Sequence, residues 1–440
     1  MLEESIRLRP DVIVADVSMP LVNGLDSARR IREQTQRLAS ISFQLAGFSA
    51  VGAKRPKCAS NRQDTFSKSG NTDGRRYRLG NWRKEPTARL RTYDEKETLK
   101  QFNLAFATAL IALFTLSPCA LHAADPAPLT QIGSTPLPEV TGGDFDHFAV
   151  DLRHNRLYVA AEVYASIEVF NLKTGKHLLS ARGVVKSPRK IVFLEDRNQL
   201  LVADAGNASC EFLDGTSLQL IKSVALDPGP DAGVYDPQSH IFYVGNGGRA
   251  AKTEFSYVSM ISVDKQEVVG RIRVEAATLK TLVLDPATQK LYATMRDKNQ
   301  VAVVNLEKKA VEQTWSSPEL HVDSAMAYDP IHKRIFVGDR NPGKLVVLDA
   351  SNGHVVGTLD IGNVSDDMTY DAAHHRIYIT SEDGLDVVAQ DSPDRYHVVQ
   401  HVDTFGGKTS IYVPSIGRFF VVHTRGDLAK EAGLQIFKVN

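Results

Sequence analysis

The stretch Asp285-Pro286-Ala287-Thr288-Gln289-Lys290-Leu291-Tyr292-Ala293 decides the fold, because its pattern returns along the chain. The pattern is an Asp, often followed by Pro, then about four polar residues and a short apolar run with a central, mostly aromatic residue. The central residues are 158, 201, 243, 292, 336, 378 and 420, at spacings of 43, 42, 49, 44, 42 and 42. A period of this length is typical of proteins in which one structural unit repeats.

Each copy also contains a later alternating strand and a polar turn, as in residues 345–349 before Ser351-Asn352-Gly353-His354. Asp-Pro and Asn-Gly steps between short β-rich runs are typical of antiparallel hairpins. Four strands in about 42 residues, repeated seven times, predict an all-β protein, a seven-bladed β-propeller over residues 125–440.

The seventh copy ends at Asn440 one strand short of a complete blade. Residues 129–137 (LTQIGSTPL) resemble the missing fourth strand, for example His354–Leu359 in the fifth copy. We therefore expect the N-terminal strand of the propeller to complete the last blade, which removes both open edges.

The repeat resembles the YVTN-type (YncE-like) propeller proteins of bacteria, over residues 129–440. The resemblance rests on structural motifs, so it implies the fold and leaves the activity open. Similar propellers include sugar-acid lactonases, quinoprotein or haem dehydrogenase subunits and exported binding proteins. Some YVTN-type relatives bind DNA, but residues 125–440 carry 32 Lys+Arg and 40 Asp+Glu, a net charge of −8. This charge disfavours a nucleic-acid partner.

Ahead of the propeller the composition changes twice, although the whole 440-residue chain has 52 basic and 52 acidic residues. Residues 37–98 lie in a basic, aperiodic segment that predicts a disordered extension. Residues 99–124 have a basic start, an apolar core and small residues at the end, the pattern of a signal peptide. The alternatives are a membrane anchor, for which the apolar run is short, and lipidation at Cys119.

This pattern predicts a periplasmic or secreted protein with no stable membrane span. Because a signal peptide belongs at an N-terminus, we hypothesise that residues 1–98 come from an over-extended reading frame starting upstream of Leu99.

Residues 1–36 form a separate fragment, in which 9–30 resemble the third strand and following loop of a response-regulator receiver domain. Asp16 would match the phosphoacceptor of that family. The fragment lacks the acidic pair that binds Mg²⁺, so a vestigial receiver is favoured over a functional phosphorelay protein.

The sequence contains no strong catalytic motif. Its three cysteines are far apart, and it has no CxxCH, HExxH, GxSxG or GxGxxG motif, which excludes several haem, zinc, hydrolase and dinucleotide sites. We expect Cys210 to be a small buried residue. A monomeric binding or scaffold module for a small molecule, glycan or protein is favoured, without a cofactor. The enzyme alternative is a lactone hydrolase holding a divalent cation such as Ca²⁺ in its channel mouth.

The candidate site is the mouth of the central channel. The fifth residue before each Asp-Pro position should begin an innermost strand and face the axis, and its neighbours add further polar groups. These positions predict a ligand-binding ring of Asp146, His147, Arg189, Lys190, Asp231, Lys280, Asp323, Asp366, Asp367 and Lys408, with Ser324 and Thr409 beside them. Either the ring is a mixed-charge cup for a polar ligand, or neighbouring blades pair these charges as a structural salt-bridge network.

A second candidate is the insertion in the third copy, which explains the 49-residue spacing. Residues 245–256 are longer than an ordinary hairpin loop. We expect either an adaptable recognition loop or a neutral surface insertion.

Overall fold

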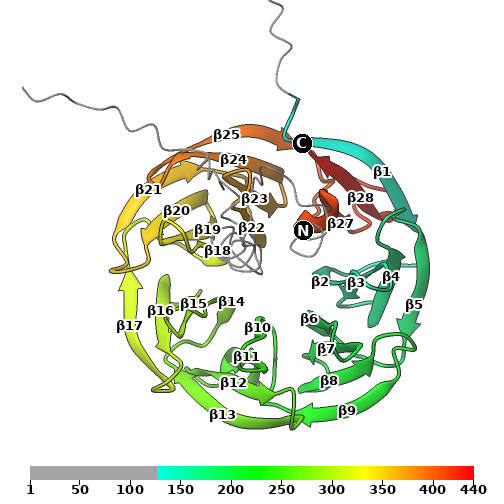
Figure 1. Ribbon diagram of the computed structural model, residues 1–440, viewed down its shortest axis with the longest axis horizontal. Helices are drawn as coiled ribbons and strands as arrows, with labels where there is room; N and C mark the ends of the chain where they lie inside the picture. The colour runs from blue at the N-terminus through cyan, green and yellow to red at the C-terminus, as the bar shows by residue number, and fades with distance from the viewer. Residues whose placement is uncertain (1–125) are drawn as a thin grey trace, which may run out of the picture. The chain divides into compact units, whose positions relative to one another are not determined.

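Residues 126–440 are the part of the chain that the computed structural model describes. They form seven four-stranded antiparallel sheets arranged around a central axis (Figure 1). This confirms the predicted all-β, seven-bladed propeller. The predictions for residues 1–36, 37–98 and 99–124, including Asp16 and Cys119, lie outside the described residues.

Each blade runs from an innermost to an outermost strand. Blades one to three are β2 (Phe145–Asp151), β3 (Arg156–Ala161), β4 (Ser166–Asn171), β5 (His177–Arg182); β6 (Pro188–Leu194), β7 (Gln199–Asp204), β8 (Ser209–Asp214), β9 (Leu220–Ala225); β10 (Gly233–Asp236), β11 (Ile241–Gly247), β12 (Ser256–Ser262), β13 (Glu267–Val274). Blades four and five are β14 (Leu279–Asp285), β15 (Lys290–Met295), β16 (Gln300–Asn305), β17 (Ala310–Ser316); β18 (Asp323–Asp329), β19 (Arg334–Arg340), β20 (Gly343–Asp349), β21 (Val355–Asp360). Blades six and seven are β22 (Asp367–Asp371), β23 (Arg376–Ser381), β24 (Gly384–Ser392), β25 (Arg395–Val402); β26 (Thr409–Val413), β27 (Arg418–His423), β28 (Ala432–Val439), β1 (Leu129–Leu137).

Two short helical turns interrupt this pattern within the described residues. The 3-10 turn η1 (Pro414–Ile416) connects β26 to β27, and the single turn α4 (Gly248–Ala251) lies in the insertion of blade three. No helix in residues 126–440 is long and apolar enough to cross a membrane.

The repeated apolar-aromatic-apolar run forms the second strand of every blade. Its central residues, which include Tyr158, Tyr292 and Phe420, are at most 3 % exposed. Seven apolar clusters lie between neighbouring blades, and one of them joins Leu157 of blade one to Leu434 of blade seven. Because one blade buries only half of each cluster, the core exists only when the blades pack on each other.

The recurring Asp at the end of the innermost strand holds the first hairpin turn. The Asp329 carboxylate accepts a hydrogen bond from the backbone N–H of His332, and its Oδ2 lies 2.7 Å from the His332 Nδ1. Asp371 holds His374 in the same way. These loop histidines therefore have a structural role in the hairpins that connect the first and second strands.

The ring closes as the sequence predicts, with β1 on the outer side of β28 in blade seven (Figure 1). The two strands are antiparallel, and their register runs from Leu129 opposite Val439 to Leu137 opposite Ala432. The β1 strand also contacts both neighbouring blades. Gln400 of blade six exchanges two 2.8 Å hydrogen bonds with the Leu129 backbone. The Thr135 hydroxyl donates to the carbonyl of Gly175 in blade one.

Candidate functional site

The predicted site residues lie at one end of the propeller. In an antiparallel blade the segment that enters the innermost strand and the turn between the second and third strands are at the same end. At this end the described residues line three cavities, of about 390, 560 and 40 Å³.

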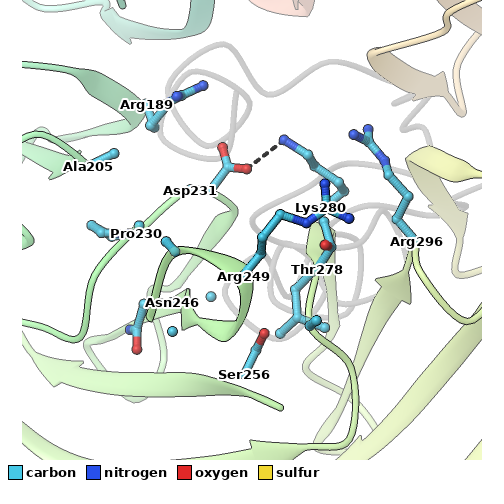
Figure 2. Close-up of a pocket in the computed structure, with 16 residues that line it drawn as sticks. Arg189, Ala205, Pro230, Asp231, Asn246, Arg249, Ser256, Thr278, Lys280 and Arg296 are labelled. Carbon is cyan, nitrogen blue, oxygen red and sulfur yellow. Dashed lines mark hydrogen bonds and ion pairs between the residues drawn. The ribbon is translucent and has the colours of Figure 1, made fainter. Parts of the chain in front are cut away.

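The 390 Å³ cavity lies over blades two to four, and we call it the cationic pocket. Four cationic side chains line it, with Asp231 as the one carboxylate among its lining residues (Figure 2). The cations are Arg189 of β6, Arg249 of α4, Lys280 of β14 and Arg296, which directly follows β15. Its volume is within the range of small-molecule sites.

Two of the four cations are neutralised by carboxylates of neighbouring blades. Arg189 donates a 2.6 Å hydrogen bond to Glu162 and lies 3.5 Å from Asp146, both in blade one. The Lys280 Nζ lies 2.6 Å from Asp231 Oδ2 of blade three. Such pairs between blades are the structural alternative that the sequence left open.

The other two cations have no such partner. Within residues 126–440, no carboxylate pairs with Arg249 or Arg296. Arg249 is exposed, whereas Arg296 is half-buried and donates to the Ser324 hydroxyl at 2.5 Å. Burial and the nearby Arg340 lower the pKa of Arg296, and the carboxylates of Asp366, Asp231 and Asp323 act in the opposite direction. Arg249 and Arg296 are therefore the two cations of the pocket that have no direct ion pair among the described residues, although the Ser324 hydroxyl that accepts from Arg296 itself donates to Asp366.

The insertion of blade three builds one wall of this pocket. The β11 strand continues to Gly247, and α4 then turns the chain so that the Arg249 N–H donates to the Ala277 carbonyl at 2.8 Å. Gly247 and Gly248 both have positive φ, a backbone conformation that glycine adopts readily. The insertion is therefore a structured part of the pocket that is hydrogen-bonded to the neighbouring blade.

The 40 Å³ cavity lies at the channel axis, and we call it the axial cavity. It is lined by Asp146, His147, Asp231, Lys280, Thr281, Ser324, Asp366, Asp367 and Thr409. The His147 ring lies between two carboxylates, 3.3 Å from Asp367 and 3.3 Å from Asp146. Burial and Lys190 act to lower the pKa of His147, but the two carboxylates outweigh them and raise it.

The 560 Å³ cavity lies across blades six, seven and one and contains Lys408. The Lys408 Nζ is 2.8 Å from Asp144 and 3.3 Å from Glu382, so its charge is compensated. Lys408 and Lys280, which the repeat pattern predicted to share one cup, line different cavities.

The structure thus divides the predicted ring. Seven of its ten residues line the cationic pocket or the axial cavity: Asp146, His147, Arg189, Asp231, Lys280, Asp366 and Asp367. Lys190 lines none of the three cavities, and burial lowers its pKa. Asp323 is fully buried in blade five.

Arg249 and Arg296 are not among the residues that the sequence predicted for the site. Arg296 is the fourth residue after Tyr292, the central residue of its repeat, and the equivalent residue is Glu162 in blade one and Arg340 in blade five. Comparing this position in all seven repeats, as was done for the position at the start of the inner strand, would have pointed to Arg296. Arg249 lies in a non-repeating insertion, where the repeat gives no such signal.

A metal at the channel mouth was part of the enzyme alternative. Within residues 126–440, no three or more His, Cys, Asp or Glu side chains are grouped so that they could hold a metal ion. A divalent cation at the channel mouth therefore stays a prediction. Cys210 is fully buried, and burial raises the pKa of its thiol, so it is not a nucleophile.

The chain matches no family model and has no significant match among curated proteins. It resembles a chain of the crystal structure of a mitotic checkpoint complex, at 14 % identity and a TM-score of 0.58, over 70 % of this chain and 92 % of that one. It also resembles a chain of hydrazine synthase from Kuenenia stuttgartiensis, at 15 % identity and a TM-score of 0.56, over 73 % and 99 %. At these identities the likeness shows the propeller fold alone. The YVTN-type and receiver resemblances stay predictions.

Proposed function

We propose that this propeller is a binding module whose cationic pocket takes a small anionic molecule. The observation that carries the proposal is Arg296, a half-buried guanidinium that has no carboxylate partner within residues 126–440 and lines a pocket with three other cations. A buried charge is costly unless it is paired, so a ligand that brings the missing negative charge is stabilised there.

Charge matching narrows the ligand to a compact dianion. Arg189 and Lys280 are already paired, which leaves Arg249 and Arg296 for the ligand. Two guanidinium groups can each donate two hydrogen bonds to a phosphate, sulfate or dicarboxylate. Asp231, which faces Lys280 from the neighbouring blade, can accept a hydrogen bond from a ligand hydroxyl (Figure 2).

The double variant R249Q/R296Q tests this role. We expect it to weaken the binding of sulfate, phosphate monoesters or succinate at least about a hundredfold, since a hydrogen bond to a charged group contributes about 1.5–3 kcal/mol. Calorimetric titration against these dianions and their neutral or monoanionic analogues measures the effect.

The matched control is R153Q/R395Q, which removes the same net charge at exposed positions that do not line the pocket. It should bind within about threefold of the wild type, because distant exposed charges are screened. Binding that is equal in both double variants, or a wild type that prefers no dianion, would contradict the proposal.

We also propose that the binding module is exported. This rests on the signal-peptide pattern of residues 99–124. In a bacterial host, we expect a periplasmic or secreted product that begins close to Asp125, which N-terminal sequencing would identify. A mature product that retains residues 1–98 would contradict both export by this signal and the over-extended reading frame.

A further inference from the structure

Two buried aspartates face each other at the channel-mouth end of blade five. Asp323 begins β18, Asp339 lies near the end of β19, and the two residues are opposite each other in the β18–β19 register. Asp323 is 0 % exposed and Asp339 is 1 % exposed.

The fold leaves most of their oxygens without partners. Neither carboxylate oxygen of Asp323 has a hydrogen-bond partner within the described residues, and Asp339 Oδ1 also has none. Asp339 Oδ2 accepts a 2.9 Å hydrogen bond from the backbone N–H of His321. The position equivalent to Asp323 carries no acidic residue in the other blades, where it is Phe145, Pro188, Pro230, Leu279, Ser365 and Gly407. The propeller fold therefore does not require a carboxylate at Asp323.

Two buried carboxylates side by side cannot both ionise without a large cost, so the pair retains a proton that free aspartates lose. Burial raises the pKa of Asp323 to about 7, and burial together with Asp323 raises the pKa of Asp339 to about 8. The charged or titratable groups that face the pair are Arg296 from blade four, His321 and Glu319 before β18, and Lys344 of β20. Arg296 is itself faced by Arg340, Asp366 and Asp231.

The pair is connected to the cationic pocket through Arg296. The Arg296 Nε donates to the backbone carbonyl of Asp323 at 3.5 Å, and its Nη2 donates to the hydroxyl of the next residue, Ser324. The same guanidinium lines the pocket (Figure 2). The same side chain thus contacts the backbone of Asp323, lines the space for a ligand and is close enough to Asp323 to act on its pKa.

We infer that Asp323 and Asp339 form a proton switch that controls anion binding in the cationic pocket. When the pair is protonated, the charge of Arg296 is available to the ligand. When the pair loses its proton, the new negative charge behind Arg296 attracts the guanidinium and repels the anion. This inference rests on the proposed function, because it describes the regulation of the same site.

The sign of the pH dependence follows directly. Deprotonation increases as the pH rises through about 7 to 8, so anion affinity decreases over that range. By linkage, an anion that binds the protonated form better must itself promote protonation, so binding takes up protons.

Sulfate is the probe, because its charge does not change between about pH 6 and pH 9. Calorimetric titration of the full chain should give an affinity about tenfold lower at the higher pH, a change within the usual range of coupling between sites. Titrations in buffers of different ionisation enthalpy should show proton uptake on binding.

The double variant D323N/D339N should bind sulfate with a flat pH profile and an affinity at high pH close to that of the wild type at low pH. The control H321Q, which removes the neighbouring imidazole, should retain the wild-type profile. If D323N/D339N folds poorly, the single variant D323N should still flatten the pH profile of sulfate binding. Infrared spectroscopy of the wild type near pH 7 should also show the carbonyl band of a protonated carboxyl group.

Sulfate binding with a flat wild-type profile, an unchanged profile in D323N/D339N, or no protonated carboxyl group near pH 7 would overturn the proton switch and leave the anion site intact. If sulfate does not bind at any pH, the anion site itself is contradicted, and so is the proton switch that depends on it.

Discussion

Deleting residues 129–137 is expected to open the ring and remove most of the stability of the propeller. The deletion removes the buried side chains of Leu129 and Leu137 and the whole ladder between β1 and β28. Loss of a buried leucine side chain alone costs about 2–5 kcal/mol, and a typical protein has only about 5–15 kcal/mol in total. The contacts of β1 with blades six and one are lost as well.

The deletion should also cause self-association, because β28 becomes an exposed edge strand. Thermal unfolding and light scattering measure the two effects. The control is I132D, which places a charge on a side chain of the same strand that is 48 % exposed and should change the free energy of unfolding by less than about 0.5 kcal/mol.

A peptide of residues 128–138 added in trans should restore part of the lost stability. A deletion variant that remains monomeric with an unchanged melting temperature would show that β1 does not close the ring.

The fold could be predicted because its determining contacts are repeated. Tyr158, Tyr292 and Tyr378 fill equivalent places in three blades, so the same local pattern recurs at a fixed period. Ring closure could be predicted for the same reason, since the last copy lacks one strand and Leu129–Leu137 has the required pattern.

The site could be predicted only where it follows the repeat. The inner-strand position places Asp146 and Asp231 near the axis, and both line the axial cavity. Which charges are neutralised depends on side-chain reach across blades, as for Lys280 with Asp231, and the repeat does not specify this. Arg249 was missed because its position depends on how the insertion folds.

Asp323 shows a further limit of counting positions. It lies one residue before Ser324, which lines the axial cavity, but the β18–β19 register is irregular between Asp323 and Ala325, and Asp323 is buried within blade five opposite Asp339. A shift of one residue therefore changes a predicted ligand contact into a buried carboxyl group with a raised pKa.

The variant G248A should weaken anion binding more than about tenfold by displacing the wall of the cationic pocket. Gly248 has a φ of +55°, is buried, and lies against the backbone of the next blade. A Cβ at this position would overlap the carbonyl oxygen of Ala277 and the hydroxyl of Ser256. The Ala277 carbonyl belongs to the main chain and cannot rotate away, so α4 must shift. The Arg249 N–H then loses its hydrogen bond to this carbonyl.

The matched control is G417A, whose backbone has nearly the same φ of +56° but whose added Cβ would meet its nearest atom only at 3.9 Å, at the Val439 carbonyl oxygen. Both variants bear the cost of a left-handed alanine, about 1 kcal/mol, so their difference isolates the overlap with Ala277. We expect G417A to bind sulfate normally, and G248A to lose about 2–4 kcal/mol of stability and more than tenfold in sulfate affinity. Equal affinities in the two variants, measured by calorimetry on folded protein, would show that the position of α4 does not determine the site, and the anion would then have to be bound by Arg296 and Lys280 without Arg249.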